Sequence, residues 1–310
     1  MAQRYRWRYL LILPTLLLLA VLAIGIHAYA RFTTMIVPLR DRACCALPAD
    51  TGLAITPVVV TTADHLALTC WYLPSQNRAA IILLHGEGGS RQTMLAHLRM
   101  FAQHGYGVLS CDRRGHGASG GDQRSWGWLD VGDVGPMLDD IQRRPEVDPA
   151  HIGVLGFSMG AQIMLRATAQ YPAIHAVVAD GPVPATTADL FPAAGVTEWP
   201  RVSVDWLDNW FVDRLLEHQL HMPAPTSVVQ AVAQRPAQPL LIISTGQSGH
   251  GRELRQAAWF VAAARAAKDL WEIPDVGHGE GLAKHPADYA QRVLGFFDTA
   301  LLAQTTTAQP

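Results

Sequence analysis

The sequence predicts an α/β fold, in which a mostly parallel sheet of about eight strands is covered by helices on both faces. Short apolar runs alternate with segments of helical periodicity along most of the chain, as is typical of parallel sheets. The 310 residues are 49% hydrophobic and only 16% charged, so they can form a large core. We therefore expect a ligand site beyond the carboxyl ends of the strands.

The expected elements follow one another regularly from residue 58 onward. An antiparallel pair of strands comes first, at 58–60 and 66–73. Six further strands are expected at 80–84, 107–111, 152–157, 176–179, 240–244 and 270–273. Helices are expected where apolar residues recur with the helical period, at 92–103, 131–143, 161–170, 254–267 and 286–302.

The segment 183–236 interrupts this order between the sixth and seventh strands. It contains six prolines and several large aromatic residues. We interpret it as a small, mostly helical cap over the site, with Trp199, Trp206 and Trp210 contributing to a substrate pocket. The alternative is a surface excursion whose tryptophans only pack on the main domain.

The N-terminus carries the pattern of a membrane-spanning helix. Three arginines, Arg4, Arg6 and Arg8, precede an apolar run from Leu10 to Ile26, which extends to Ala30. Its length is close to that needed to cross a bilayer, and aromatic residues flank it as in interfacial belts. Because basic flanks stay in the cytoplasm, we expect a single-pass anchor through residues 10–30, with the catalytic domain on the non-cytoplasmic side.

A cleaved signal peptide is the alternative for this segment. Ala28-Tyr29-Ala30 has the small-x-small form of a cleavage site, and cleavage there would give a secreted protein. The apolar run is long for a signal peptide, which favours a retained anchor. The expected organisation is therefore an anchor or uncleaved signal at 1–31, a linker at 32–54, and a main domain at 55–305 that includes the cap.

Charge and cysteine content narrow the function classes. Residues 50–310 carry 18 basic and 25 acidic residues, a net charge of −7, which argues against nucleic-acid binding. The four cysteines form no C-x-x-C pattern, and no metal site is expected. Export would permit a disulfide such as Cys44 or Cys45 with Cys70, and the sequence leaves the connectivity open, whereas Cys111 is expected to be a buried free thiol.

The most informative motif is Gly156-Phe157-Ser158-Met159-Gly160. It has the G-x-S-x-G form and lies between a predicted strand and a predicted helix. In that position the serine stands on a tight turn with its hydroxyl exposed at the carboxyl edge of the sheet. The following helix directs its N-terminal amides toward the serine, where they favour developing negative charge. Ser158 is therefore predicted to be a nucleophile.

Three further motifs accompany this turn in a fixed order. They are 84–90 (LHGEGGS) after the third strand, 111–119 (CDRRGHGAS) after the fourth, and 276–279 (VGHG) after the last. Together with the serine turn, they resemble the α/β-hydrolase superfamily over about residues 55–305. Within it the chain is most similar to bacterial serine-aminopeptidase-like and esterase-like hydrolases, including membrane-anchored ones.

The resemblance implies a role for several residues. His278, late in the chain and beside a strand end, matches the catalytic base that removes the proton of Ser158. The backbone N–H groups of Met159 and Glu87 match the donors of an oxyanion hole. The Glu87 carboxylate is expected to point to solvent, since it would otherwise oppose the oxyanion. His85, His116, Asp112 and Arg114 are expected to hold their loops by hydrogen bonds.

The third member of the triad is where the sequence departs from the family. The family usually places Asp soon after the seventh strand, but the segment 245–253 (TGQSGHGRE) contains none. Glu253 is the first carboxylate there, and its longer side chain could reach His278. Asp180, after the sixth strand, is the alternative, although Asp180-Gly181-Pro182 also reads as a turn. A site lacking both remains open.

Two functions follow from these observations. The first is a serine hydrolase, without a cofactor, that cleaves ester, thioester or amide bonds of a small acyl-type substrate through an acyl-enzyme on Ser158. An ester is preferred over a peptide because the aromatic cap suits an acyl group. The alternative is a catalytically degenerate hydrolase fold that serves as an exported, membrane-anchored binding or scaffold protein. The oligomeric state cannot be inferred from the sequence.

Overall fold

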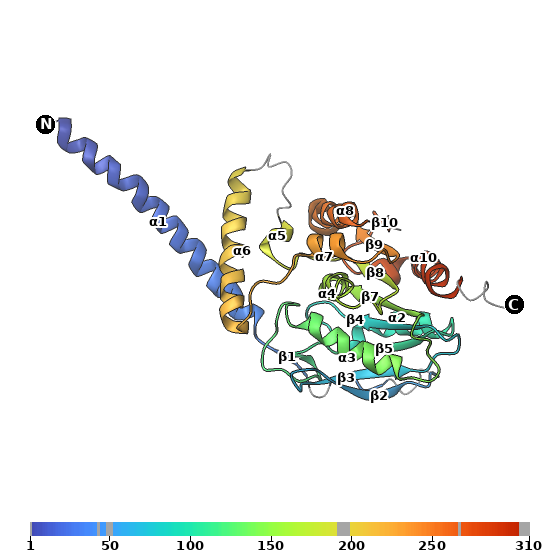
Figure 1. Ribbon diagram of the computed structural model, residues 1–310. Coiled ribbons are helices and arrows are strands. Elements are labelled where there is room, and N and C mark those ends of the chain that lie inside the picture. Colours follow the sequence, from blue (N-terminus) through green and yellow to red (C-terminus); the bar gives the residue numbers. More distant parts are fainter. Residues whose placement is uncertain (1, 42–43, 48–51, 191–198, 266–267, 304–310) are drawn as a thin grey trace. The chain divides into compact units, whose positions relative to one another are not determined.

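The computed structural model describes residues 2–41, 44–47, 52–190, 199–265 and 268–303, with side chains from residue 12 onward except 199–203 and 249–250. Its centre is an eight-stranded sheet with the strand order β10-β9-β8-β7-β4-β5-β3-β2 (Figure 1). The strands are β2 (Thr56–Thr61), β3 (Ala67–Leu73), β4 (Ala80–Leu84), β5 (Gly107–Cys111), β7 (Ile152–Phe157), β8 (Ala176–Asp180), β9 (Leu240–Thr245) and β10 (Lys268–Ile273).

Six of these strands are parallel, from β5 through β4, β7, β8 and β9 to β10. The first two, β2 and β3, run antiparallel and extend the sheet at the β5 edge. The predicted fold class is thereby confirmed, including the leading antiparallel pair. The carboxyl ends of the six parallel strands lie along one edge of the sheet, where the site is expected.

Helices cover the sheet on both faces. Strand β4 shows why: all five residues are buried, with Ile81 and Leu83 in one core and Ile82 and Leu84 in the other. The first core also contains α2 (Leu95–Ala102) and α10 (Pro286–Phe297). The second contains α3 (Asp130–Gln142), α4 (Met159–Ala167), α7 (Val228–Gln234) and α8 (Arg252–Ala263). Shorter turns of helix are η1 (Arg91–Met94), η2 (Ser248–Gly251), α9 (Gly281–Lys284) and η3 (Asp298–Leu302).

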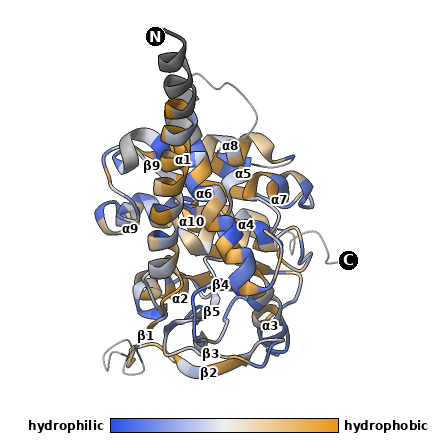
Figure 2. Cartoon of the chain, turned by 90° about the vertical axis from the view of Figure 1, so that its left-hand side faces the viewer, coloured by the Kyte–Doolittle hydropathy of each residue, from blue (hydrophilic) through white to orange (hydrophobic). Residues whose placement is uncertain are grey.

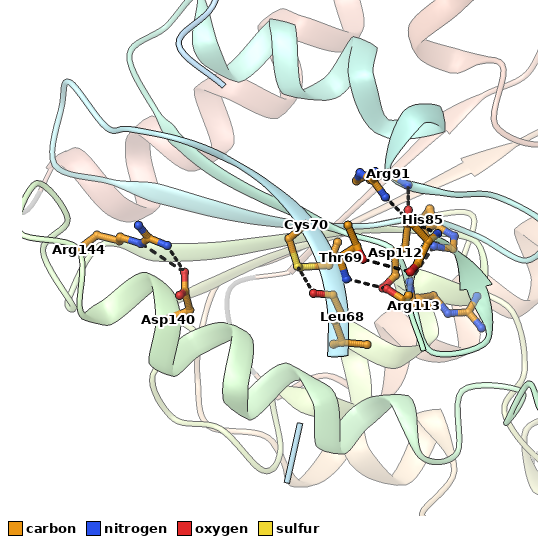
Figure 3. Close-up of a disulfide and its surroundings, with 12 residues drawn as sticks. Leu68, Thr69, Cys70, His85, Arg91, Asp112, Arg113, Asp140 and Arg144 are labelled. Atoms are coloured by element: carbon orange, nitrogen blue, oxygen red, sulfur yellow. Dashed lines mark hydrogen bonds and ion pairs between the residues drawn. A yellow bond between two sulfur atoms is a disulfide. The ribbon is translucent and has the colours of Figure 1, made fainter. Parts of the chain in front are cut away.

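The expectation that Cys111 is a free thiol was wrong, and the partner of Cys70 is not the one given as an example. Cys70 and Cys111 form a disulfide (Figure 3), and Cys44 is bonded to its neighbour Cys45. Cys70 lies on β3 and Cys111 on β5, and the two are directly paired in the antiparallel register, with Cα atoms 4.0 Å apart. Adjacent cross-strand cysteines can be bridged without moving the backbone. The sequence does not reveal this pairing because it does not give the register between β3 and β5.

Part of the predicted linker has a defined structure. Strand β1 (Leu39–Arg40) pairs in parallel with β6 (His116–Gly117), and the two form a separate two-stranded sheet. In addition, Arg91 donates a hydrogen bond from Nη2 to the carbonyl oxygen of Cys45, over 3.1 Å. The segment after residue 38 is therefore tied to the loops that follow β4 and β5.

The chain divides into two compact units. One contains 38–185 and 225–310, which include the sheet and its covering helices. The other contains 1–37 and 186–224, which include α1 (Ala2–Met35), α5 (Thr187–Leu190) and α6 (Trp199–Leu220). The predicted cap segment 183–236 is thus shared between them, since α7 belongs to the sheet unit. Its role over the site stays a prediction.

Helix α1 contains a long apolar segment. Within its part from Ile12 to Met35, an 18-residue stretch has a mean hydropathy of 2.1 and is only 6% buried, so the helix is long and apolar enough to cross a membrane. Hydrophobic residues predominate in the part of α1 that is coloured by hydropathy in Figure 2. A cleavable signal peptide passes the same test of length and hydropathy.

Candidate active site

The site residues lie at the carboxyl ends of four strands or in the segments that follow them. Ser158 follows β7, Asp180 ends β8, Glu253 follows β9 and His278 follows β10. Because these strands are parallel neighbours, residues that are far apart in the sequence meet at one edge. The loop after β4, which contains Glu87, and the turn after β5, which contains Asp112, lie at the same edge.

Ser158 lies in a sharp turn between β7 and α4. Its backbone has φ 53° and ψ −113°, a conformation that non-glycine residues rarely adopt. Its N–H donates to the carbonyl of Asp180 over 2.7 Å, which holds the turn against β8. A serine in such a strained turn, directly before a helix N-terminus, has the geometry of a nucleophile elbow.

The flanking glycines are required by close packing. A Cβ atom on Gly156 would lie 2.3 Å from the carbonyl oxygen of Gly160, and one on Gly160 would lie 2.2 Å from that of Leu84. Both approaches are far below van der Waals contact with rigid backbone. On the loop after β4, a Cβ on Gly86 would lie 2.9 Å from the Cβ of Ser158. The glycines therefore let the serine turn and this loop approach each other.

His278 is oriented by Glu253. Its Nδ1 lies 2.8 Å from Oε2 of Glu253, while Oε1 of the same carboxylate accepts hydrogen bonds from the Thr245 N–H (2.8 Å) and hydroxyl (2.9 Å). The His278 ring also packs against Phe157, the residue before the serine, with ring centroids 5.0 Å apart. The carboxylate, the imidazole and the serine turn thus form one connected group.

Thr245 is a residue that the sequence reading missed. It is the last residue of β9, and its two donors fix one oxygen of Glu253 so that the other faces His278. The sequence gives no sign of this role, because a threonine at the end of a buried strand is common. The hydrogen bonds of Thr245 depend on where α8 positions Glu253.

The charges of this group support each other. The hydrogen bond and charge of Glu253 raise the pKa of His278 above its usual value, although partial burial works in the opposite direction. Burial by itself raises the pKa of Glu253, but hydrogen bonds from His278 and Thr245 outweigh burial, and the net pKa lies below its usual value. Glu253 is therefore ionised at neutral pH and stabilises the protonated form of His278.

Asp180 is placed elsewhere by the structure. Its carboxylate accepts a hydrogen bond from the Tyr289 hydroxyl over 2.7 Å, and Tyr289 lies 3.3 Å from Nε2 of His97. Burial, together with the nearby charge of Glu253, raises the pKa of Asp180 to about 6, although the hydrogen bond from Tyr289 acts in the opposite direction. Of the two carboxylates considered for the third position, only Glu253 is hydrogen-bonded to the His278 ring.

Replacing Asp180 with Asn tests this difference. The amide oxygen can still accept from Tyr289, so we expect D180N to retain most of its hydrolytic activity, unlike a change at Glu253. In the folded wild type the Asp180 carboxyl has a pKa of about 6, whereas its usual value is 3.8. The fold therefore favours the protonated carboxyl, and this contribution to stability is lost as pH rises through about 6. Urea unfolding at pH 4 and pH 8 should show D180N gaining about 2–3 kcal/mol relative to wild type at the higher pH. An activity loss as severe as that of a Glu253 variant would identify Asp180 as the orienting acid.

The loop after β4 is held by His85. Its Nδ1 lies 2.7 Å from the carbonyl oxygen of Gly86, and its Nε2 accepts from the N–H of Arg113 over 3.0 Å. The ring is completely buried, and this burial lowers its pKa well below the usual value. The neutral imidazole therefore joins this loop to the turn after β5, in the structural role expected for it.

The expectation for the Glu87 side chain was wrong. Its carboxylate does not point to solvent but is paired with the guanidinium groups of Arg124 and Arg113, and Nε2 of His116 lies 3.5 Å away. Burial raises the pKa of Glu87, but the contact with His116 and the charges of Arg113 and Arg124 lower it to about 2. The negative charge is thus compensated within the loop, so the Glu87 N–H is compatible with an oxyanion nearby.

Asp112 anchors the turn after β5 (Figure 3). Its carboxylate accepts from the backbone N–H groups of Arg91 (2.6 Å) and Ala118 (2.8 Å) and is paired with the Arg91 guanidinium. Its side chain is therefore fully used in positioning the loops. Asp112 also lies near Cys44 and Cys45, but both sulfur atoms are in the disulfide, so this group does not fit a metal ion.

The cap residues of the prediction lie on α6. Trp206 and Trp210 are 43% and 37% exposed, and their rings are stacked with centroids 6.4 Å apart. Trp199 begins the helix, but its side chain lies outside the described residues. A role of these tryptophans in substrate binding stays a prediction.

The chain is similar to several known proteins. Residues 75–273 match the family model described as serine aminopeptidase, S33. An uncharacterised protein of Mycobacterium tuberculosis is 28% identical over 75% of this chain and 77% of its own length. A polyketide transferase of Stachybotrys chlorohalonatus is 35% identical over 39% of this chain and 42% of its own length. Among solved structures, an esterase of Pyrococcus furiosus superposes with a TM-score of 0.66 at 23% identity, covering 86% of this chain and 99% of that one.

Proposed function

Because the chain belongs to the serine aminopeptidase, S33, family of α/β hydrolases, we propose that this hydrolase cleaves carboxylic esters through an acyl-enzyme on Ser158. The observation that carries the proposal is the hydrogen bond between His278 Nδ1 and Glu253, on a ring that packs beside the serine turn. Such an arrangement gives a serine hydroxyl the base it needs.

The reaction follows from these positions. His278 uses Nε2 to accept the proton as Ser158 Oγ attacks the carbonyl carbon, and Glu253 stabilises the imidazolium that forms. The N–H groups of Met159 and Glu87 stabilise the tetrahedral oxyanion; as the first residue of α4, Met159 has no acceptor within its own helix. His278 then protonates the leaving alcohol. In the second half of the reaction, His278 removes a proton from the attacking water and returns it to Ser158 as the acid is released.

The electrostatics favour an ester over a peptide amino terminus. An aminopeptidase needs an anionic group that binds the substrate's ammonium. Glu87, the carboxylate on the oxyanion loop, is already paired with Arg113 and Arg124. Asp180 is buried against Tyr289, and Glu253 is used by His278 and Thr245. Each carboxylate described at this edge therefore has another partner.

Thioesters would be attacked by the same groups, and the similarity to polyketide transferases favours acyl substrates.

A matched pair of substrates tests this proposal. The p-nitrophenyl esters of propionic acid and of alanine differ only in the α-ammonium group. We expect the propionyl ester to be hydrolysed with a higher kcat/KM, and longer unsubstituted acyl chains to be accepted as well. A preference for the alanyl ester would favour an aminopeptidase. Absence of turnover for every ester by the folded protein would favour the binding or scaffold alternative.

We also propose that α1 is a retained membrane anchor and that the sheet unit lies on the non-cytoplasmic side. The arginines before the apolar run support this orientation, and the Cys70–Cys111 disulfide suits an oxidising compartment.

A further inference from the structure

The apolar part of α1 ends at a defined level. Eighteen residues separate Arg8 from His27, the next residue with a basic or acidic side chain. At 1.5 Å per residue they span about 27 Å, close to the thickness of the hydrocarbon core of a bilayer. His27 and Arg31 therefore mark the level at which α1 would leave the hydrocarbon on the side opposite its N-terminus.

Helix α6 is attached to α1 at this level. Asp208 of α6 lies 2.8 Å from His27 Nδ1 and is paired with the Arg31 guanidinium, and only 9% of its side chain is exposed. Arg31 Nη2 also lies 3.4 Å from the side-chain oxygen of Asn209. A carboxylate that is almost buried and paired with two groups on α1 fixes the position of α6 along the anchor.

An aromatic path leads from α1 to the exposed face of α6. Phe211 lines an apolar groove together with residues of α1 that include Leu18, Leu22 and Tyr29. The Phe211 ring contacts Trp210 in an edge-on arrangement, with centroids 5.2 Å apart, and Trp210 stacks on Trp206. The two tryptophans are one helical turn apart, so they share a face of α6.

We propose that the Trp206–Trp210 face of α6 lies in the interfacial region of the bilayer that α1 crosses. Ring contacts connect the tryptophans, through Phe211, to the apolar groove on α1, and the Asp208 pairs hold α6 at the level of the outer boundary. Tryptophan is the residue enriched at this depth, since its ring is apolar and its N–H reaches polar groups. The groove beside Phe211, with a volume of about 380 Å³ and an almost wholly apolar lining, lies at hydrocarbon depth and suits a lipid acyl chain.

This inference goes beyond ester hydrolysis and does not depend on it, but it does require α1 to cross the membrane. It assigns the tryptophan pair to the lipid surface. A second copy of the chain is a less suitable occupant, because α1 itself already supplies the adjoining apolar surface and sets the depth of the pair.

Quenching of tryptophan fluorescence by brominated lipid tests the inference. The full chain is reconstituted into phosphatidylcholine vesicles with bromine atoms near the carbonyl end of the acyl chains, and wild type is compared with W206F/W210F. Phenylalanine keeps the apolar packing, so circular dichroism should be unchanged. The matched control is W259F, because Trp259 is also 37% exposed but lies on α8 in the sheet unit.

In wild type, the brominated lipid should quench part of the tryptophan emission. We expect this quenchable part to be smaller in W206F/W210F and to be retained in W259F. All three proteins should stay with the vesicles after alkaline extraction. Equal quenching of the three proteins would overturn the inference, as would a larger loss in W259F. Release of wild type by alkaline extraction would also overturn it, because α1 would then not span the bilayer. None of these readouts requires the protein to be active.

Discussion

Replacing Ser158 with Ala is expected to lower kcat for ester hydrolysis by about 10⁶-fold, to the level left by the oxyanion hole and substrate binding alone. The variant removes the attacking oxygen, and no other described hydroxyl stands at the turn before α4. The backbone strain at φ 53° is the same for Ala as for Ser, so the fold should not change. The measurement is the rate of p-nitrophenol release under saturating substrate.

The matched control is Ser75→Ala. Ser75 precedes β4, and its hydroxyl bonds to the carbonyl of Ala79, at the end of the sheet remote from Ser158. We expect this variant to hydrolyse esters at the wild-type rate. If S158A kept even a hundredth of the wild-type rate, another residue would have to be the nucleophile.

The second large effect is expected for Glu253→Gln, with a fall in kcat of up to about 10⁴-fold. Thr245 presents two donors to one oxygen of the side chain, so the glutamine must place its carbonyl oxygen there. Its NH₂ group then faces His278 Nδ1, which has to act as acceptor. The imidazole proton is thereby moved to Nε2, and this tautomer cannot accept a proton from Ser158.

The same variant should change the pH dependence of kcat/KM. In wild type, Glu253 raises the pKa of His278, and because the base works only when neutral, activity should fall as pH drops through this raised pKa. Removing the negative charge lowers the pKa of His278, so the acid limb of the E253Q profile should move to lower pH. A profile that keeps its midpoint, with kcat close to wild type, would show that Glu253 does not orient the base.

The sheet was predictable because its strands are short apolar runs separated by clear helical periods. Strands β4, β5 and β7 have the predicted boundaries, and the others differ by one or two residues. Contacts that depend on register or on the packing of distant loops were not predictable. The pairing of Cys70 with Cys111 requires the β3–β5 register, and the neutralisation of Glu87 requires the position of Arg124, 37 residues later.

In the candidate active site, too, local sequence predicts some residues, whereas others depend on contacts between distant segments. Ser158 and His278 stand in motifs whose local sequence predicts a turn and a loop at strand ends. The order of residues left Glu253 and Asp180 open, since both follow strands that end at the same edge. The choice depends on side-chain geometry: α8 places Glu253 within 2.8 Å of the ring, while Tyr289, from a helix 109 residues after Asp180, occupies the other carboxylate.

The central claim, that Ser158 is a nucleophile activated by His278, is tested most directly by intact-mass analysis after reaction with a fluorophosphonate, followed by peptide mapping. The proposed mechanism predicts one adduct per chain, on the peptide that contains Ser158, and none in S158A. Folded wild-type protein that gains no mass, or that carries the adduct on a different residue, would contradict it.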